Sequence, residues 1–154
     1  MPLNIGDAAP AFSLPTDGGG SVSLSGLSGK NVCLYFYPKD DTSGCTKEAI
    51  AFNGLRSAFT AVNTHIIGVS ADSVSSHDKF KKKYDLAFSL ASDEEKSMLE
   101  AYGVWVEKSM YGKKYMGIER TTVLIDTSGK VAALWSKVKV DGHAEEVLAA
   151  AQKL

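Results

Sequence analysis

The stretch VCLYFYPKDDTSGCTKEAIAF, residues 32–52, contains the strand, loop and helix on which the fold prediction depends. Its first six residues are apolar or aromatic and predict a buried strand at residues 32–37. A polar loop follows, and a helix is predicted over residues 42–60. Its apolar residues recur at helical spacing: Ala49, Phe52, Leu55 and Phe59. This order places Cys45 in the first turn of a helix that follows a buried strand.

The position of Cys45 favours a reactive thiol. Free N–H groups and the positive end of the helix dipole stabilise a thiolate there. Thr42, three residues earlier, can place its hydroxyl beside the sulfur across one helical turn. Pro38 has no N–H, so it can cover the thiolate without offering a hydrogen-bond donor to competing water. Because the polar loop at residues 40–44 is no environment for a packing cysteine, we expect Cys45 to be a nucleophile.

The rest of the chain alternates strands and helices. The predicted elements are a hairpin (12–14 and 21–24, with a turn at 16–20), a strand (65–70), a helix (73–84), a strand (88–90), a helix introduced by a capping box at 92–95 and ended by Gly103, an alternating segment (104–135) whose last hairpin has arms at 121–125 and 130–135 around a turn at 126–129, and a helix (142–153). Strand–helix–strand units require parallel pairing, and the late hairpin adds antiparallel strands. We therefore predict one α/β domain over residues 1–154, with a thioredoxin-like fold, a mixed central sheet, helices on both faces and an N-terminal β-hairpin extension.

A cation is expected beside the thiol, and the chain has only two arginines. Arg56 lies three helical turns from Cys45 and is too distant. Arg120 directly precedes the predicted strand at residues 121–125, from which its side chain can reach the N-terminal end of the helix. Its guanidinium suits an anion such as a thiolate, so Arg120 is the expected partner of Cys45.

Composition narrows the classes of function. The chain has 154 residues, 44% hydrophobic and 23% charged, with a net charge of −1, which points to neither nucleic acid nor a membrane surface. No run approaches the ~20 apolar residues of a membrane span, and the N-terminus lacks the pattern of a secretory signal. Two cysteines fit a reducing cytosol, so we expect a cytoplasmic protein.

The other titratable residues predict no cofactor and no metal site. The three histidines, His65, His77 and His143, fall on separate elements without metal-ligand spacing to the cysteines, so we expect surface or packing roles. The lysines at residues 79–83 are expected to form a solvated face of their helix rather than an anion site.

The pattern Pro38-x-x-x-Thr42-x-x-Cys45, together with Glu119-Arg120-Thr121-Thr122, resembles a peroxiredoxin. Residues 35–42 and 138–144 are similar to the peroxiredoxin Q subfamily, also called bacterioferritin comigratory protein. The resemblance implies that Cys45 attacks a hydroperoxide and becomes a sulfenic acid, in a pocket built by Pro38, Thr42 and Arg120. It also implies antioxidant function and a monomer or weak homodimer.

Two departures from the family pattern bear on recycling. Ser43 replaces a usual proline, and Ile50 stands where many members carry a resolving cysteine. Other members carry that cysteine on a later helix, and residues 73–84 contain none. Cys33 lies five residues before its strand ends at Pro38, a distance of about 16 Å at ~3.3 Å per residue, and Cys45 is expected near that end. A disulfide between the two cysteines needs Cα atoms within about 7 Å. We expect Cys33 to be a core cysteine, with a resolving role after local unfolding as the alternative.

The sequence therefore predicts a one-cysteine peroxidase whose sulfenic acid is reduced by an external thiol: thioredoxin, glutaredoxin or glutathione. The alternative is a thioredoxin-like binding or holdase protein without significant peroxidase turnover. A thiol–disulfide oxidoreductase has no support, because the chain has no Cys-x-x-Cys motif.

Overall fold

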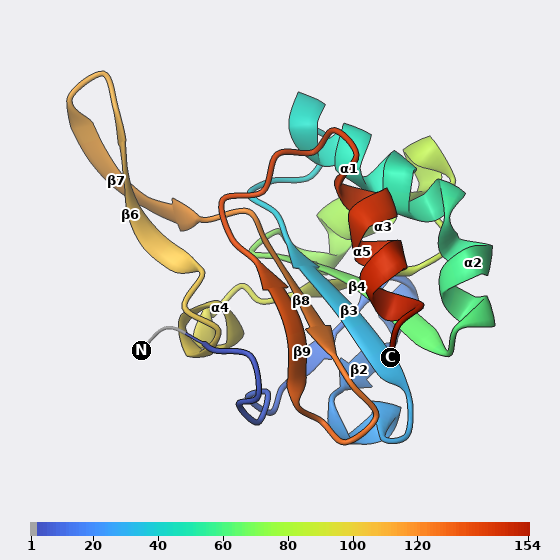
Figure 1. Ribbon diagram of the computed structural model, residues 1–154. Coiled ribbons are helices and arrows are strands. Elements are labelled where there is room, and N and C mark those ends of the chain that lie inside the picture. The colour runs from blue at the N-terminus through green and yellow to red at the C-terminus, as the bar shows by residue number, and fades with distance from the viewer. Residues whose placement is uncertain (1–2) are drawn as a thin grey trace.

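A computed structural model describes residues 3–154, and its centre is a five-stranded sheet in the order β5-β4-β3-β8-β9 (Figure 1). In chain order these strands are β3 (Asn31–Phe36), β4 (Thr64–Ser70), β5 (Ser89–Ser92), β8 (Thr121–Ile125) and β9 (Val131–Trp135). β3 pairs in parallel with β4, and β4 with β5, while β8 pairs antiparallel with both β3 and β9. The predicted mixed sheet is confirmed.

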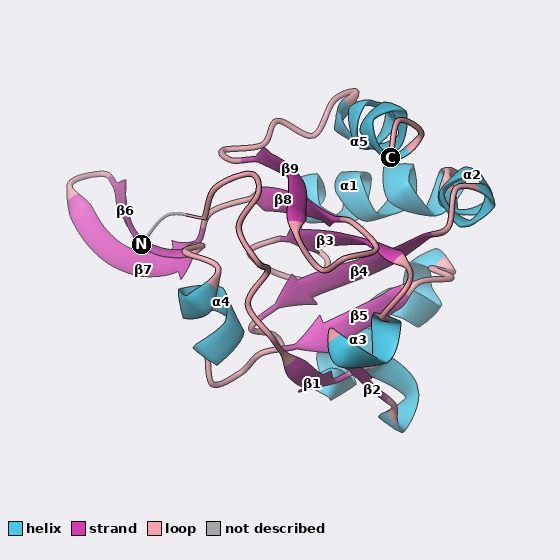
Figure 2. Ribbon diagram, turned by 60° about the horizontal axis from the view of Figure 1, so that its bottom comes forward, coloured by secondary structure: helices cyan, strands magenta, loops and turns pink. Residues whose placement is uncertain are grey.

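Helices cover both faces of this sheet, as predicted. Four helices pack on one face: α1 (Ser43–Gly54), α2 (Arg56–Ala61), α3 (Val74–Tyr84) and α5 (His143–Ala151). Figure 2 shows α1, α2 and α5 together on one side of the strands. The other face packs against α4 (Ser97–Ala101) and the N-terminal segment, which contains the hairpin of β1 (Ser13–Pro15) and β2 (Ser21–Ser23).

Strand β3 is the centre of both cores, and all six of its residues are buried. Because side chains alternate along a strand, Cys33 and Tyr35 join the cluster under α1, whereas Leu34 and Phe36 join the cluster on the opposite face. A strand covered on both faces has a continuous apolar sequence, which explains why residues 32–37 gave a clear prediction.

The helix predicted over residues 42–60 is two helices. α1 ends at Gly54, and Leu55 leaves the helical conformation with φ −102° and ψ 5° before α2 begins. The Arg56 guanidinium donates a 2.8 Å hydrogen bond to the Asn53 carbonyl at this break. Apolar spacing continues across the break because Phe52 and Phe59 both reach the same core.

The predicted capping box at residues 92–95 is wrong. Ser92 is the last residue of β5 and pairs with Ser70 of β4, so it does not cap a helix. α4 begins after Lys96, whose φ of 64° is left-handed. The helix is instead anchored by buried Asp93, whose carboxylate accepts a 2.8 Å hydrogen bond from the Leu99 N–H.

The segment between α4 and β8 forms a second hairpin that the alternation alone did not resolve. β6 (Trp105–Met110) and β7 (Lys113–Ile118) form a separate two-stranded sheet, which projects away from the central sheet (Figures 1 and 2). Its turn, Tyr111–Gly112, has positive φ at both residues, as a two-residue hairpin turn requires. At residues 3–154, no helix is both long and apolar enough to cross a membrane.

Candidate active site

Cys45 lies in the first turn of α1, directly after the loop at residues 38–42 that leaves β3. The first hydrogen bond of the helix joins the Thr46 N–H to the Thr42 carbonyl at 2.8 Å. The N–H groups of the residues before Thr46 therefore have no acceptor within the helix. The Cys45 side chain is only 2% exposed, so its thiol is largely shielded from water.

Arg120 reaches Cys45 from the neighbouring strand. It directly precedes β8, and β8 pairs with β3 so that Thr121 lies opposite Phe36, at the end of β3 from which the loop begins. Its Nη2 donates to the Cys45 sulfur at 3.3 Å. The expected placement of Arg120 beside Cys45 is confirmed, and it follows from the register of the sheet.

The same guanidinium contacts Glu48, which sequence reasoning missed. Nη1 of Arg120 lies 2.6 Å from Oε1 of Glu48, whose side chain is 1% exposed, and Oε2 has no hydrogen-bond partner among the described residues. Burial raises the pKa of Glu48 to about 7, although Arg120 opposes the rise. Glu48 thus holds Arg120 in place beside Cys45.

A signal for Glu48 was present in the sequence. It directly precedes Ala49 on the helix face that also carries Phe52, and both of those side chains are fully buried. A carboxylate on such a face requires a cation, and the chain has only two arginines.

Gly44 permits the close approach of Arg120. A Cβ atom built on Gly44 would lie 3.2 Å from Nη2 of Arg120, which is tighter than ordinary van der Waals contact. A side chain at this position would push the guanidinium by a few tenths of an ångström. Gly44 is therefore a second residue of the site that the motif analysis did not single out.

Pro38 and Thr42 flank the loop in front of Cys45, and both are exposed. The hydroxyl of Thr42 donates a 2.8 Å hydrogen bond to the Lys39 carbonyl. This bond closes the loop onto Lys39, and the position of the hydroxyl beside the sulfur stays a prediction. Thr42 is the N-cap residue of α1 and has extended backbone angles.

Cys33 lies in the same cluster of side chains as Cys45, under α1, and is fully buried in β3. Burial raises the pKa of its thiol well above the ordinary value, and the Glu48 charge raises it further. Both cysteines are free thiols. Ile50, where family members often carry a second cysteine, is half exposed.

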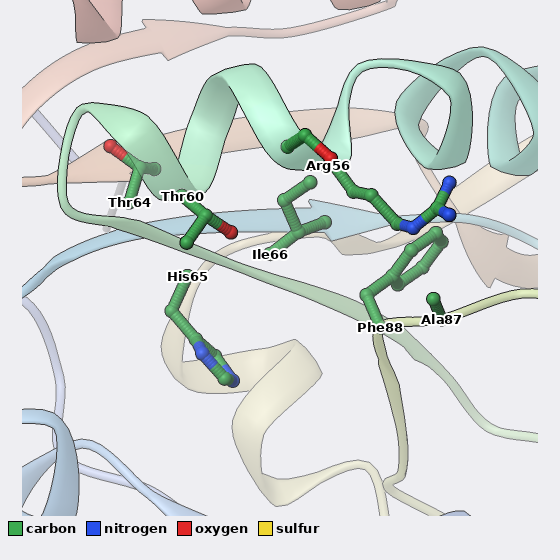
Figure 3. Close-up of a pocket in the computed structure, with 8 residues that line it drawn as sticks. Arg56, Thr60, Thr64, His65, Ile66, Ala87 and Phe88 are labelled. Atoms are coloured by element: carbon green, nitrogen blue, oxygen red, sulfur yellow. The ribbon is translucent and has the colours of Figure 1, made fainter.

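Arg56, the chain's other arginine, and His65 lie away from this site. Arg56, Thr60, His65, Ile66 and Phe88 are among the residues that line a cavity of about 390 Å³ between α2 and the first residues of β4, at the end of the sheet opposite Cys45 (Figure 3). Within residues 3–154, no cluster of three or more His, Cys, Asp or Glu side chains could hold a metal ion.

The other two histidines lie in the interior of the protein. Both are buried, and each ring makes hydrogen bonds: His143 with the Thr122 hydroxyl at 2.7 Å, and His77 with Asp40 and the Ala91 carbonyl. Burial lowers the pKa of His143.

Comparison with known proteins gives a consistent result. Residues 5–134 match the AhpC/TSA family. A "Putative peroxiredoxin bcp" of Coxiella burnetii is 53% identical over 148 residues, which cover 96% of this chain and 98% of the relative. "Peroxiredoxin Bcp" of Bacillus subtilis is 48% identical over 148 residues, with 96% and 94% covered.

Solved structures give the same picture. A structure of Xanthomonas campestris peroxiredoxin Q superposes with a TM-score of 0.90 at 44% identity, over 98% of this chain and 96% of that one. A cysteine-to-serine mutant of Xylella fastidiosa PrxQ superposes with a TM-score of 0.94 at 39% identity, over 99% and 98%. These structures share the arrangement of sheet and helices described above.

Proposed function

The chain belongs to the AhpC/TSA family and is a thioredoxin-fold, thiol-dependent peroxidase of the peroxiredoxin type, and on this premise we propose that Cys45 is its peroxidatic residue. The observation that carries the proposal is the contact of 3.3 Å between Nη2 of Arg120 and the Cys45 sulfur. A guanidinium at this distance stabilises the thiolate and remains close to the oxygen that the thiolate attacks.

The reaction we propose is a displacement at oxygen. The Cys45 thiolate attacks one oxygen of a hydroperoxide, the O–O bond breaks, and the sulfur becomes a sulfenic acid while the leaving oxygen takes a proton and departs as water or an alcohol. Arg120 faces the negative charge that moves from sulfur to oxygen, while Pro38 and Thr42 border the approach from the loop. The proposed substrates are hydrogen peroxide and organic hydroperoxides.

We propose that an external thiol completes the cycle. Cys33 lies inside β3, and Ile50 replaces the cysteine that many relatives carry at that position. A first external thiol condenses with the sulfenic acid to give a mixed disulfide and water, and a second thiol releases Cys45 and leaves with the first as a disulfide. Thioredoxin, glutaredoxin and glutathione all supply such thiols.

The reducing cytoplasm is the compartment we propose for this cycle. Both cysteines are free, and a thiol-dependent peroxidase requires a pool of reduced thiols to return Cys45 to its active form.

The test is peroxide consumption by the Cys45→Ser variant in the presence of excess thiol. We expect the variant to lose at least about 100-fold of the wild-type rate, because a hydroxyl has no comparable nucleophilicity. Cys33→Ser is the matched control and should consume peroxide at the wild-type rate. Undiminished turnover by Cys45→Ser would overturn the assignment, and lost turnover by Cys33→Ser would overturn the one-cysteine cycle. Turnover with glutathione alone, compared with thioredoxin plus its reductase, identifies the reductant.

A further inference from the structure

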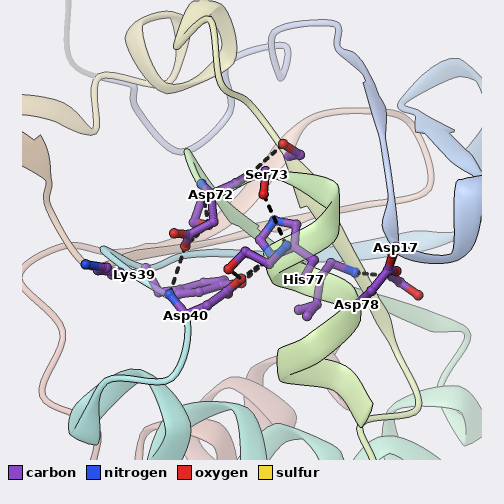
Figure 4. Close-up of polar contacts among 12 residues, drawn as sticks. Asp17, Lys39, Asp40, Asp72, Ser73, His77 and Asp78 are labelled. Carbon is purple, nitrogen blue, oxygen red and sulfur yellow. Dashed lines mark hydrogen bonds and ion pairs between the residues drawn. The ribbon is translucent and has the colours of Figure 1, made fainter. Parts of the chain in front are cut away.

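Asp40, in the middle of the loop before Cys45, is held from two directions. Its side chain is buried, and its Oδ1 accepts a 2.6 Å hydrogen bond from the Tyr37 hydroxyl. Its backbone N–H donates at 2.8 Å to the Asp72 carboxylate, which also accepts a hydrogen bond from Ser70. These contacts, some of which are drawn in Figure 4, join the loop to the end of β4 and to the residues that precede α3.

His77 of α3 makes the third contact with Asp40. Its Nδ1 lies 2.7 Å from Oδ2 of Asp40 (Figure 4), and its Nε2 lies 3.0 Å from the carbonyl oxygen of Ala91 in β5. The imidazole is fully buried. One ring therefore connects three parts of the molecule: the loop, α3 and β5.

The acceptors around the ring fix where its protons lie. A carbonyl oxygen can only accept, so Nε2 carries a proton that it donates to Ala91. Nδ1 and the Asp40 carboxylate must share a second proton, since two lone pairs cannot face each other at 2.7 Å. The Ser76 hydroxyl donates to the same carboxylate oxygen at 2.8 Å. The pair is therefore net neutral and fully hydrogen-bonded.

Stability alone does not account for such a pair. Well-packed apolar side chains of similar volume usually serve a core at least as well as a buried ion pair, whereas removal of one partner is strongly destabilising. The pair instead fixes the position of the loop. Short hydrogen bonds at both ring nitrogens hold the loop in one position relative to α3 and β5.

α3 also contacts the loop at its surface, through Asp41. Lys83 and Tyr84 each place their polar atom 2.8 Å from the Asp41 carboxylate. Because Lys83 is 57% and Asp41 42% exposed, this pair is screened by solvent and is expected to contribute little. The chain thus offers a buried and an exposed contact between the same helix and the same loop.

We propose that His77 is a positioning residue of the peroxidase: with Asp40 it forms a buried, proton-sharing pair that sets the loop at residues 38–42 in front of Cys45. The inference rests on the proposed function of Cys45. His77 does not touch the sulfur. It acts through Asp40 on Pro38 and Thr42, which border the approach of the peroxide.

Two substitutions of His77 separate positioning from a general structural role. The amide nitrogen of asparagine can replace Nδ1, so His77→Asn keeps a donor to Asp40 and loses the one to Ala91. The amide nitrogen of glutamine can replace Nε2, so His77→Gln keeps the donor to Ala91 and loses the one to the loop. A role in packing alone would affect both variants alike.

The measurement compares two reactions of Cys45 in the full-length, reduced protein: oxidation by hydrogen peroxide and alkylation by iodoacetamide. Alkylation needs the thiolate but not a peroxide held by the loop, so the ratio of the two rate constants reports the position of the loop rather than the amount of folded protein. We expect His77→Gln to lower this ratio at least tenfold and His77→Asn to stay within threefold of wild type. Lys83→Met, which removes the exposed contact, should also stay within threefold.

Other outcomes overturn the inference. A wild-type ratio in His77→Gln, or equal losses in both His77 variants, would show that His77 does not position the loop. If His77→Gln does not fold, Asp40→Ala, which removes the other half of the pair, is judged by the same tenfold threshold. A wild-type Cys45 that reacts with peroxide no faster than a free thiol would overturn the proposed function and this inference together, whereas a fast wild type with an unaffected variant overturns this inference alone.

Discussion

Cys45 and Cys33 lie in the same cluster of side chains between the central sheet and α1, and both are almost completely buried. The two thiols differ in the groups that surround them. Cys45 occupies the first turn of a helix and accepts a hydrogen bond from Arg120, whereas Cys33 lies within β3 between β4 and β8, with aliphatic residues beside it in both neighbouring strands.

The comparison supports our proposal that burial alone does not decide the chemistry of these thiols. Burial by itself raises the pKa of a thiol, as it does for Cys33, and so suppresses the thiolate. A buried cysteine becomes a nucleophile only where cations and free N–H groups offset that cost. The Arg120–Glu48 pair supplies the cation beside Cys45, and Cys33 has aliphatic neighbours in its place.

Removal of the cation should have the largest effect. In Arg120→Met, the long apolar stem keeps most of the packing while the guanidinium is lost. We expect the rate constant for Cys45 oxidation by hydrogen peroxide to fall roughly 100- to 1,000-fold, the usual loss when one transition-state donor is removed. The measurement is stopped-flow or competition kinetics with the reduced protein.

Arg56→Met is the matched control for that prediction, because it removes the chain's other arginine from the far end of the sheet. It should leave the rate constant unchanged. Equal rate constants for Arg120→Met and wild type would mean that the environment of Cys45 does not depend on Arg120.

Glu48 should make the free energy of unfolding of the protein depend on pH. Its pKa is about 7 in the folded protein, whereas the unfolded chain keeps the ordinary value of 4.5, so the folded state retains a proton that the unfolded state has released. The resulting stabilisation is complete below pH ~4.5 and is lost as the pH rises through about 7. Between pH 5 and pH 8, wild type should lose roughly 2–3 kcal/mol more of its free energy of unfolding than Glu48→Gln, which cannot titrate.

Urea unfolding at the two pH values measures this difference. Both proteins share every other titrating group, so the subtraction isolates Glu48. Parallel pH dependence in the two proteins would show that the Glu48 proton is not held by the folded site.

Cys33→Ser should separate stability from activity. A hydroxyl in this fully buried position has no assured partner, so we expect the free energy of unfolding to drop by about 1–3 kcal/mol. The rate constant for peroxide should remain within twofold of wild type when measured well below the unfolding temperature. Cys33→Ala, which buries no polar group, is the control, and a large loss of peroxide rate in either variant would give Cys33 a role in the reaction.

The smallest effect is expected from Gly44→Ala. The added methyl group would lie 3.2 Å from Nη2 of Arg120, so the guanidinium must shift by a few tenths of an ångström relative to the Cys45 sulfur. We expect about a two- to fivefold slower reaction with peroxide, because hydrogen bonds weaken gradually with distance. Gly54→Ala, with nothing within 4 Å of the added atom, is the control. Identical kinetics in Gly44→Ala would show that Arg120 has room to adjust.

Much of the fold could be predicted because its central elements obey strong local rules. β3 is apolar throughout since both its faces are covered, and α1 carries an apolar stripe. The errors came where tertiary contacts override local signals. Ser92 has the residue type of a helix cap but stays in the β4–β5 ladder, and Leu55 breaks a helix whose apolar spacing continues.

The site was predicted in outline and missed in its supporting residues. The spacing of Pro38, Thr42 and Cys45 is visible in the chain, and Arg120 follows from the order of the strands. Glu48 and His77 were not recognised, because their partners are 72 and 37 residues away along the chain. Only the three-dimensional register brings those partners within hydrogen-bond distance.

The central claim is that its neighbours make Cys45, and not Cys33, the thiol that peroxide oxidises. The most direct test is mass spectrometry of the native protein after one equivalent of hydrogen peroxide in the presence of a sulfenic-acid trap. The account predicts the trap adduct on the peptide that contains Cys45 and an unmodified Cys33. An adduct on Cys33, or a disulfide between the two cysteines as the main product, would contradict it.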